Sequence, residues 1–573
     1  MGTISDKLMR IINTKEDIRQ ALISKGYDVP TSIPFKEYAK MILDLPCNAD
    51  SFPDIEGIVA RYSASGLTNE QMAANPVWVD KTGNGHDLQL KNFSWKGMSG
   101  IGGYVADIDE WGTNSTAAYF ERNSIKITAT FKENASLGLL YHNIKLRQSC
   151  VLKVTGIPEG CDAFLDDRLG NRFYMSEDGV YEIIPSNFLA EALYLSIEKY
   201  PERWYGSKLT IEQLPLYPGA LVFDGVDDYG TCDNFPILTK EKGYTVVALR
   251  QWITYNPNAI SAIATNASDQ SFNGAFTFEN YNKGAEQTIS YGATQITLQY
   301  SKSPFSWQTT SKYNGVNIAN GNKDATNSLV LGRSYPQRNE FANFAIWELV
   351  FLDHDATEEE LTKIKDYFVK TYPWLFPDQA WTVTGKTNED EDRATIANIT
   401  GNGNDLVLSN FGFAEGSGYN EEGEYAGYLV TDGVDDKIIS SIFKMGNDWT
   451  VIGDWELINT GKNDNAGIVK FDSIVIYNYN SMLINIKNGR NILIPDQNTV
   501  NAICSDGRIY SKDWKESIYN EETESTSKNF LTIGYSGNAY TKIAFKNLAI
   551  YPTVLSREDC IKAYNYLQTL KAK

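Results

Sequence analysis

The chain has 573 residues, 42% of them apolar and 22% charged, which is the balance of an ordinary globular protein too long for a single hydrophobic core. Its formal net charge of −20 argues against nucleic acid and anionic membrane surfaces as partners, because both would repel it. Three histidines are present, so the chain is poor in the side chain that enzymes use most for proton transfer. We therefore expect several domains, no nucleic-acid partner and no membrane partner.

The amino-terminal stretch MGTISDKLMRIINTKEDIRQ carries charges where a secretory signal would be continuously apolar, and no stretch approaches 18 apolar residues. We therefore expect no signal peptide. Six cysteines are scattered without CxxC pairs, which argues against zinc sites and against a disulfide framework. We expect reduced thiols in a cytosolic environment, and a local bridge stays open as an alternative for Cys150 and Cys161.

Residues 1–48 have the pattern of short amphipathic helices. Apolar residues recur at helical spacing from Ile4 to Ile12, and Gly26 ends a second apolar run. Ser32 is the expected N-cap of a third piece. A helical segment this small needs a partner for its apolar face, so we expect an anchor or an oligomerisation element.

From about residue 50 onward, short alternating runs bounded by Gly, Asn, Asp and Pro predict antiparallel sheets. Three landmarks then occur twice in the same order, which predicts one fold used twice. They are the motif TGNGxDL, the motif DGVDD, and an apolar strand followed by a helix capped by Thr357 or Ser556. The pairs lie at 81–95 and 399–413, at 221–230 and 429–438, and at 341–369 and 543–567.

The spacing of these landmarks differs between the two copies. From Gly83 to Asp224 is 141 residues, whereas from Gly401 to Asp432 is 31 residues. The first copy therefore carries extra residues in the number that makes a domain. We expect an inserted β-sandwich at 108–215, whose strands include one with Leu193, Leu195 and Ile197 on one face and one with Ile125, Ile127 and Ala129 on one face.

The sequence TGNGxDL, then LVFDGVDDY, then AIYPTVLSREDCIKAYNYL resembles the concanavalin A-like, laminin-G-type jelly-roll family. The resemblance covers both copies of the repeat. It implies a mainly β fold with two jelly-roll sandwiches, one discontinuous at 49–107 and 216–376 and one at 377–573. The smaller sandwich is inserted into the first of them, and the short helical segment precedes both.

The helical stretch ISDKLMRIINTKEDIRQALISKGYDVPTSIPFKEYAKMI, together with GALVFDGVDDYG, resembles appendage proteins of tailed bacteriophages. This resemblance implies a head or tail fibre of a virion, assembled in the host cytoplasm, where no signal peptide is needed. Fibres of this kind are usually trimers. The helices would then join the chain to sister chains or to other virion proteins.

The aspartates of the repeated DGVDD motif allow two interpretations. As a metal site, each group would offer hard oxygen ligands to Ca²⁺. As a hairpin turn, Asp-Gly would supply the position with positive φ, Val226 or Val434 would return to the core, and the other carboxylates would accept hydrogen bonds from the backbone. We favour the turn, because three carboxylates leave a calcium shell half filled. The residues concerned are Asp224, Asp227 and Asp228 in the first copy and Asp432, Asp435 and Asp436 in the second.

Phosphate loops and catalytic motifs are poorly matched. The TGNG stretch lacks the GxxxxGK[ST] pattern and the third glycine of GxGxxG, so we interpret it as a turn in which Asp80 takes part. The string ADIDEWG offers Asp107 and Asp109 at alternate positions, with Glu110 beside them, but it lacks the flanking glutamates of a glycosidase pair. No GxSxG or HExxH occurs. We therefore predict no catalytic residues.

Aromatic residues in loops are the remaining candidates for ligand binding, because sugars lay their C–H faces on aromatic rings. We name four: Trp252, Tyr255, Trp307 and Tyr313. The expected function is a non-enzymatic virion fibre that adheres to bacterial surface polysaccharide. A purely structural capsid or tail decoration protein is the main alternative, and a glycan depolymerase is a third.

Overall fold

The computed structural model describes most of the chain from Phe52 to Ala572. The described residues are 15, 19, 52–105, 108, 117–133, 138–144, 150–183, 193–239, 242–254, 262–267, 277–278, 294–300, 304–306, 325–333, 339–423, 425–441, 443, 446–458, 467–471, 474–478, 482–486, 490–494, 500–511, 514, 516–518, 531–536 and 539–572. Lys15 and Arg19 are helical, and the rest of the expected segment at 1–48 lies outside the described residues.

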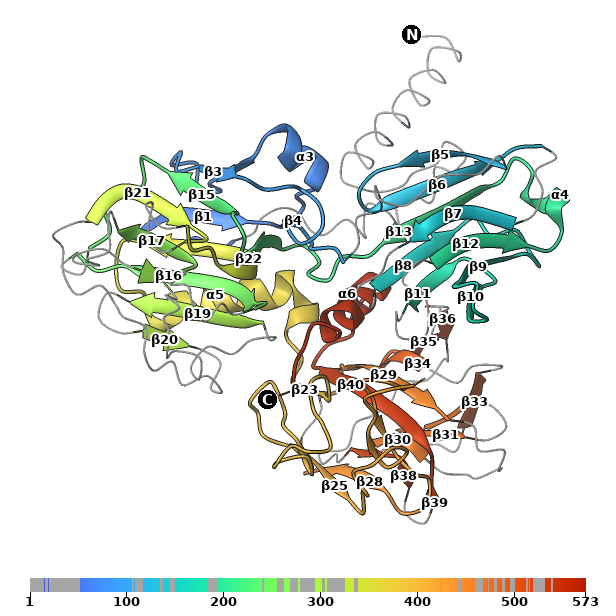
Figure 1. The fold of residues 1–573 in the computed structure, drawn as a ribbon. Coiled ribbons are helices and arrows are strands. Elements are labelled where there is room, and N and C mark those ends of the chain that lie inside the picture. Colours follow the sequence, from blue (N-terminus) through green and yellow to red (C-terminus); the bar gives the residue numbers. More distant parts are fainter. Residues whose placement is uncertain are drawn as a thin grey trace, which may run out of the picture.

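The described residues form a mainly β protein, as the sequence predicts, built from three pairs of antiparallel sheets (Figure 1). We call the pairs the first, inserted and second sandwich. One sheet of the first sandwich has the order β20-β19-β16-β22-β14-β4, with β1 paired to β22. Its strands are β1 (Ile58–Ser63), β4 (Gly100–Ile101), β14 (Leu221–Asp224), β16 (Thr245–Trp252), β19 (Gln295–Tyr300), β20 (Pro304–Ser306) and β22 (Asn343–Leu352).

The facing sheet of the first sandwich has the order β18-β17-β21-β15-β3-β2. Its strands are β2 (Val77–Trp78), β3 (Leu88–Lys91), β15 (Tyr229–Cys232), β17 (Ala264–Ala267), β18 (Thr277–Phe278) and β21 (Ala325–Leu331). Strand β3 shows why such segments are strands: Leu88 and Leu90 are buried while Gln89 and Lys91 are exposed.

The inserted sandwich consists of the sheets β10-β9-β12-β7 and β11-β8-β13-β6-β5. Its strands are β5 (Ala118–Arg122), β6 (Lys126–Phe131), β7 (Gly138–Ile144), β8 (Cys150–Thr155), β9 (Asp162–Asp166), β10 (Arg172–Met175), β11 (Gly179–Ile183), β12 (Leu193–Glu198) and β13 (Lys208–Gln213). The prediction that Leu193, Leu195 and Ile197 share the buried face of one strand is confirmed. Cys150 and Cys161 are buried free thiols.

The second sandwich consists of the sheets β26-β27-β40-β29-β34-β35-β36, with β23 paired to β40, and β24-β25-β28-β37-β30-β31-β32-β33, and a ribbon β38-β39 lies beside them. Its strands are β23 (Gln379–Thr382), β24 (Thr395–Ile396), β25 (Leu406–Ser409), β26 (Gly418–Tyr419), β27 (Leu429–Val430), β28 (Lys437–Ser440), β29 (Thr450–Leu457), β30 (Gly467–Phe471), β31 (Ile474–Asn478), β32 (Met482–Ile486), β33 (Arg490–Ile494), β34 (Val500–Cys504), β35 (Arg508–Ser511), β36 (Glu516–Ile518), β37 (Thr532–Ile533), β38 (Tyr535–Ser536), β39 (Ala539–Tyr540) and β40 (Ile543–Tyr551).

Two helices follow the central strands of the first and second sandwich, as the repeat predicts. Helix α5 (Glu358–Thr371) begins after Thr357, whose side chain forms a capping box with Glu360, and η3 (Pro373–Leu375) follows it. Helix α6 (Arg557–Leu567) begins after Ser556, whose side chain accepts a hydrogen bond from the Asp559 N–H. The described residues also include the short helices α3 (Asn69–Ala74) and α4 (Pro201–Trp204).

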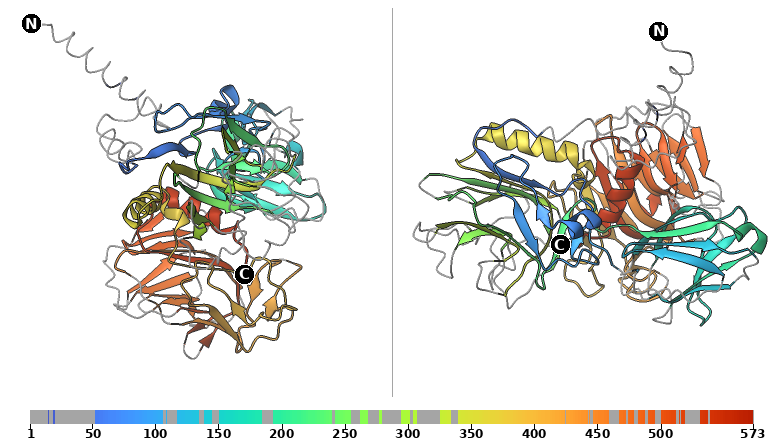
Figure 2. Two further views of the ribbon diagram at one scale, coloured as in Figure 1. Left: turned by 90° about the vertical axis from the view of Figure 1, so that its left-hand side faces the viewer. Right: turned by 90° about the horizontal axis from the view of Figure 1, so that it is seen from above.

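Each sandwich has its own apolar core, and a further apolar cluster joins all three. This shared cluster lies around α5, η3 and α6, and Figures 1 and 2 show α6 where the three sandwiches meet. It contains Val151 and Val180 of the inserted sandwich, Val247 of the first and Tyr510 of the second. The helices therefore fasten the sandwiches into one body.

Candidate functional site

The repeated DGVDD motif links the two sheets of a sandwich. In the first copy it connects β14, which pairs with β22 and β4, to β15, which pairs with β21 and β3. In the second copy it connects β27 to β28, which again belong to different sheets. The expectation of a hairpin is therefore wrong. The chain crosses from one sheet to the other, and we call this link the acidic arch.

Hydrogen bonds within the arch occupy its carboxylates. Asp224 Oδ1 accepts from the backbone N–H of Val226 at 2.7 Å and of Asp227 at 3.4 Å. Asp228 is fully buried, and its Oδ2 accepts from the Asp224 N–H at 3.0 Å while its Oδ1 accepts from the Ser99 hydroxyl at 2.9 Å. The carboxylates of Asp224 and Asp228 thus satisfy donors of the turn, as the turn interpretation requires, whereas Asp227 is exposed and takes part through its backbone.

The second arch repeats the backbone contacts of the first. Asp432 Oδ1 accepts from the N–H of Val434 at 2.7 Å and of Asp435 at 3.2 Å, and Asp436 Oδ2 accepts from the Asp432 N–H at 2.8 Å. The two valines at the arch tips, Val226 and Val434, are each 70% exposed. The expectation that they return to the core is therefore wrong, because the link passes over the end of the sandwich before its next strand begins.

Burial also governs the charge of the arches. It raises the pKa of Asp228 to about 7, against hydrogen bonds from Asp224 and Ser99 that favour the charged form. It raises the pKa of Asp436 to about 6 in the same way. The ligand oxygens of each triad lie within 4.8 Å of one another, close enough to share a cation. However, the Asp228 carboxyl has a pKa near neutral, and its two oxygens accept from the Asp224 N–H and the Ser99 hydroxyl, which suits a turn better than Ca²⁺.

The TGNG stretch is also a turn. Asp80 is buried, and its Oδ1 accepts from the N–H groups of Arg61 and Thr82, each at 3.0 Å. Asn398 has the same role in the second copy, where its Oδ1 accepts from the N–H groups of Ala380 at 3.2 Å and Thr400 at 3.1 Å. These contacts hold the turn against the neighbouring strand, so the role of Asp80 is structural.

The four aromatic candidates divide into one buried residue and three outside the described residues. Trp252 packs in the core of the first sandwich against Phe344, with ring centroids 5.7 Å apart, and is 2% exposed. Its assignment as a surface platform is therefore wrong. Tyr255, Trp307 and Tyr313 lie outside the described residues, as do the weak catalytic candidates Asp107, Asp109 and Glu110.

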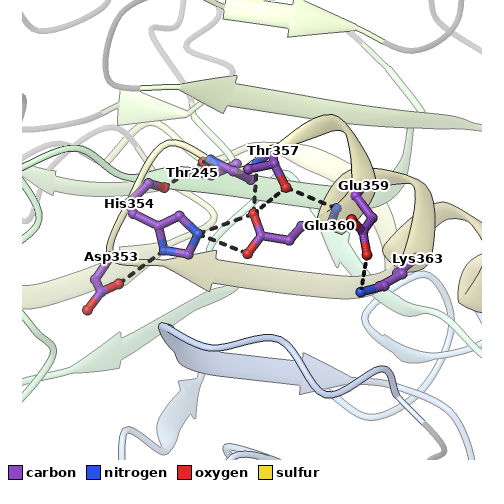
Figure 3. A network of polar contacts seen from close by, with 8 residues as sticks. Thr245, Asp353, His354, Thr357, Glu359, Glu360 and Lys363 are labelled. Carbon is purple, nitrogen blue, oxygen red and sulfur yellow. Dashed lines mark hydrogen bonds and ion pairs between the residues drawn. The ribbon is translucent and has the colours of Figure 1, made fainter.

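A cluster of polar side chains around His354 lies between the end of β22 and the start of α5 (Figure 3). His354 Nδ1 lies 3.3 Å from Asp353 Oδ1, and its Nε2 lies 3.3 Å from Glu360 Oε1. Burial opposes the charged imidazole, but these two hydrogen bonds outweigh it and raise the pKa of His354. Glu360 also accepts from the Thr357 N–H at 2.7 Å. The cluster thus belongs to the N-cap of α5.

An aromatic and polar surface on the inserted sandwich was not predicted. On the β9–β10 hairpin, Phe164 and Asp166 point away from the core, because Ala163 and Leu165 fill it. The Arg172 Nε lies 3.1 Å from Asp166 Oδ2. We define the hairpin face as Phe164, Asp166, Arg168, Arg172, Tyr174 and Tyr194.

Two cations lie over aromatic rings of the hairpin face. The guanidinium carbon of Arg172 lies 4.8 Å from the Phe164 ring centroid, and that of Arg168 lies 4.2 Å from the Tyr194 centroid. Tyr174 is 43% exposed, and its ring centroid lies 5.3 Å from that of Phe164. The signal in the sequence was the alternation in DAFLD and RFYM, where the positions between core residues are aromatic or charged.

No helix among the described residues combines the length and the apolar character needed to cross a membrane. No protein-family model matches the chain, and neither does any curated protein. Among solved structures, a Trypanosoma rangeli sialidase in complex with sialic acid is similar at 8% identity and a TM-score of 0.22, covering 79% of this chain and 83% of that one. The binding domain of botulinum neurotoxin serotype D is similar at 10% identity and a TM-score of 0.15, covering 87% and 98%. Likeness at these scores carries no argument about ligand or activity.

Proposed function

We propose that the chain is a non-enzymatic structural protein of a tailed-bacteriophage virion, a head or tail fibre that adheres to glycans of the host cell surface. The observation that carries the proposal is the apolar cluster around α6, which joins the three sandwiches. A body of this kind holds the outer sheets and the loop ends at fixed positions. The resemblance of the amino-terminal helical stretch and of GALVFDGVDDYG to appendage proteins supports the same assignment.

The titratable groups of the acidic arch and of the α5 N-cap are held in hydrogen bonds, which supports a non-enzymatic function. Both oxygens of Asp228 accept hydrogen bonds within the first arch. Glu360 is held by Thr357 and His354 at the start of a helix. Groups that are bound in turns and caps in this way stabilise the fold, and neither cluster presents a nucleophile with an adjacent base.

Multiple copies would strengthen weak adhesion. A single shallow sugar site binds weakly, but linked copies raise the effective concentration of the later binding events. We propose a trimer assembled through the segment at 1–48, which would also join the particle. No metal cofactor takes part in this proposal.

Molar mass by light scattering tests the assembly. We expect the full chain to be a trimer and a chain beginning at Ser51 to be a monomer. If both are monomers, the self-assembling fibre is wrong, and a decoration protein that docks on another virion component takes its place.

A glycan array probed with the full chain tests adhesion. We expect binding to bacterial surface polysaccharides without release of reducing sugar. The absence of binding to every glycan would favour the decoration protein, and release of reducing sugar would show a depolymerase.

A further inference from the structure

The two sheets of the inserted sandwich have different surroundings. On the sheet that contains β8 and β11, Val151 and Val180 point outward into the apolar cluster shared with the other sandwiches. That sheet is therefore partly covered by the rest of the body. On the opposite sheet, Tyr174 is 43% exposed and the Arg172 side chain is 46% exposed. The hairpin face lies on this second sheet.

The chemistry of the hairpin face combines flat apolar rings with planar polar groups. Tyr174 offers an aromatic surface on which the C–H face of a sugar ring can lie, whereas the Arg168 guanidinium lies over the Tyr194 ring. Arg172 and Asp166 lie beside Tyr174 and are paired across β9 and β10. A guanidinium supplies donors and a carboxylate supplies acceptors in a fixed geometry, which matches neighbouring hydroxyl groups.

The tip of the β9–β10 hairpin is held rigid by its own hydrogen bonds. Asp167 is 2% exposed, and its Oδ1 accepts from the N–H of Leu169 at 2.7 Å and of Asn171 at 3.0 Å. The Asn171 side chain donates to Asp167 Oδ2 at 2.6 Å. Leu169 therefore projects from an ordered turn with 62% of its surface exposed. An ordered turn loses little conformational entropy when a ligand binds.

Charge identifies the class of ligand. The Arg172 guanidinium is balanced by Asp166 and by Glu198, whose Oε2 lies 3.9 Å from Arg172 Nη1. The Lys199 ammonium is balanced by Asp162. Arg168 adds a third cation, over the Tyr194 ring, so that the three cations here equal the three carboxylates Asp162, Asp166 and Glu198 in number. A surface balanced in this way, on a chain of net charge −20, does not attract an anion. The exposed apolar groups are also separated by charged side chains, unlike the continuous apolar centre of a protein interface.

We propose that the hairpin face binds a neutral oligosaccharide, with Tyr174 as the stacking platform and the Arg172–Asp166 pair as the hydroxyl-binding element. This site rests on the adhesive function proposed above. Arg172 lies opposite Asp166 and two residues before Tyr174, on the same face of the sheet. The hydroxyl-binding element is therefore a direct neighbour of the platform, within reach of a sugar ring stacked on Tyr174.

The test uses the intact chain on an array of neutral and acidic glycans, followed by calorimetric titration of the best-bound glycan. We compare Tyr174→Leu with Tyr119→Leu, a matched control on the other sheet of the same sandwich. Tyr119 is 68% exposed, and its ring also has a cation over it, Lys132 Nζ at 4.4 Å. Tyr174→Leu removes a stacking platform and should weaken binding roughly tenfold, whereas Tyr119→Leu should leave the affinity unchanged.

A second variant guards against a folding defect in the first. Arg172→Gln changes a side chain of the proposed hydroxyl-binding element that is 46% exposed and outside the core, and we expect it to weaken binding as well. If the intact chain binds glycans while Tyr174→Leu and Arg172→Gln bind equally well, the hairpin face is not the site although adhesion stands. Binding restricted to acidic glycans would also overturn the site. If the intact chain binds no glycan, the adhesive function fails together with the site.

Discussion

The helices α5 and α6 occupy the same place in the two copies of the repeat but have different surroundings. Both carry an ion pair one turn apart, Glu359 with Lys363 and Glu558 with Lys562, each at 2.7 Å. Helix α5 has an exposed outer face, whereas most of α6 after its first turn is buried. Exposed Lys365 in α5 corresponds to Tyr564 in α6, which is 7% exposed and packs edge-to-face against Trp514, with ring centroids 5.7 Å apart.

Hydrogen bonds from the end of α6 join the first and second sandwich. Tyr566 OH accepts from the Thr294 N–H of the first sandwich at 3.2 Å. The Gln568 side chain donates to Asp454 Oδ2 of the second sandwich at 3.0 Å. The comparison teaches that a helix in the same place of the fold serves as a connector where an aromatic side chain, Tyr564, stands in the position of a charged one, Lys365.

The central strands β22 and β40 differ in a related way. Glu348, opposite Ser63, is fully buried, and its Oε2 lies 3.2 Å from Arg61 Nε. Asn547, opposite Thr382, holds the corresponding place in the second sandwich without a charge. The first copy thus carries a buried ion pair where the second carries an amide.

Removing the charge of Glu348 is expected to have the largest effect. The Glu348→Gln variant leaves the buried Arg61 guanidinium without its carboxylate, and we expect a loss of about 3–5 kcal/mol in the free energy of unfolding. The matched variant Asn547→Ala should lose about 1–2 kcal/mol. Urea unfolding followed by tryptophan fluorescence measures both. Equal losses would mean that the ion pair adds nothing beyond a neutral amide.

Exchanging the outer residues of the two helices tests the connector. Tyr564→Lys places a cation in the apolar cluster and should cost about 3 kcal/mol. It should also split the unfolding curve, because the sandwiches would no longer unfold together. Lys365→Tyr is the reciprocal control at an exposed position, and we expect a change within about 0.5 kcal/mol. A single cooperative transition in the Tyr564→Lys protein would contradict this role of α6.

The acidic arches predict a dependence of stability on pH. A buried carboxyl whose pKa is raised to about 7 binds more protons in the folded than in the unfolded state below that pH. Stability therefore falls as the pH rises from 5 to 7, by up to about 2–3 kcal/mol from Asp228. Asp228→Asn should flatten this part of the profile. For Asp436, with a pKa of about 6, the corresponding loss should be smaller and end at lower pH.

Binding of calcium would contradict the interpretation of the acidic arches as turns. An ion held by Asp224, Asp227 and Asp228 would compete with the proton and reverse the sign of the pH dependence. We expect added calcium to leave the profile unchanged. A calcium-dependent rise in stability above pH 7 that Asp228→Asn removes would show that the arch is a cation site.

The sequence predicted the elements of the repeat better than their environments. The mainly β class and the helices capped by Thr357 and Ser556 follow from local periodicity and capping residues, so they could be read directly. The exposure of Val226 depends on which sheet each flanking strand joins, and that pairing is not local. Trp252 is a core residue for the same reason, since the face of a strand is set by its partners.

Helix α6 has a consequence for the order in which the molecule is made. The strands that it connects, from Cys150 in β8 to Tyr551 in β40, are all synthesised before Arg557 leaves the ribosome. Each sandwich can form its own core earlier, but the shared cluster can close only when α6 arrives. The three sandwiches are therefore joined last. A chain that ends before Arg557 would keep its sandwiches apart and leave the apolar surface between them exposed.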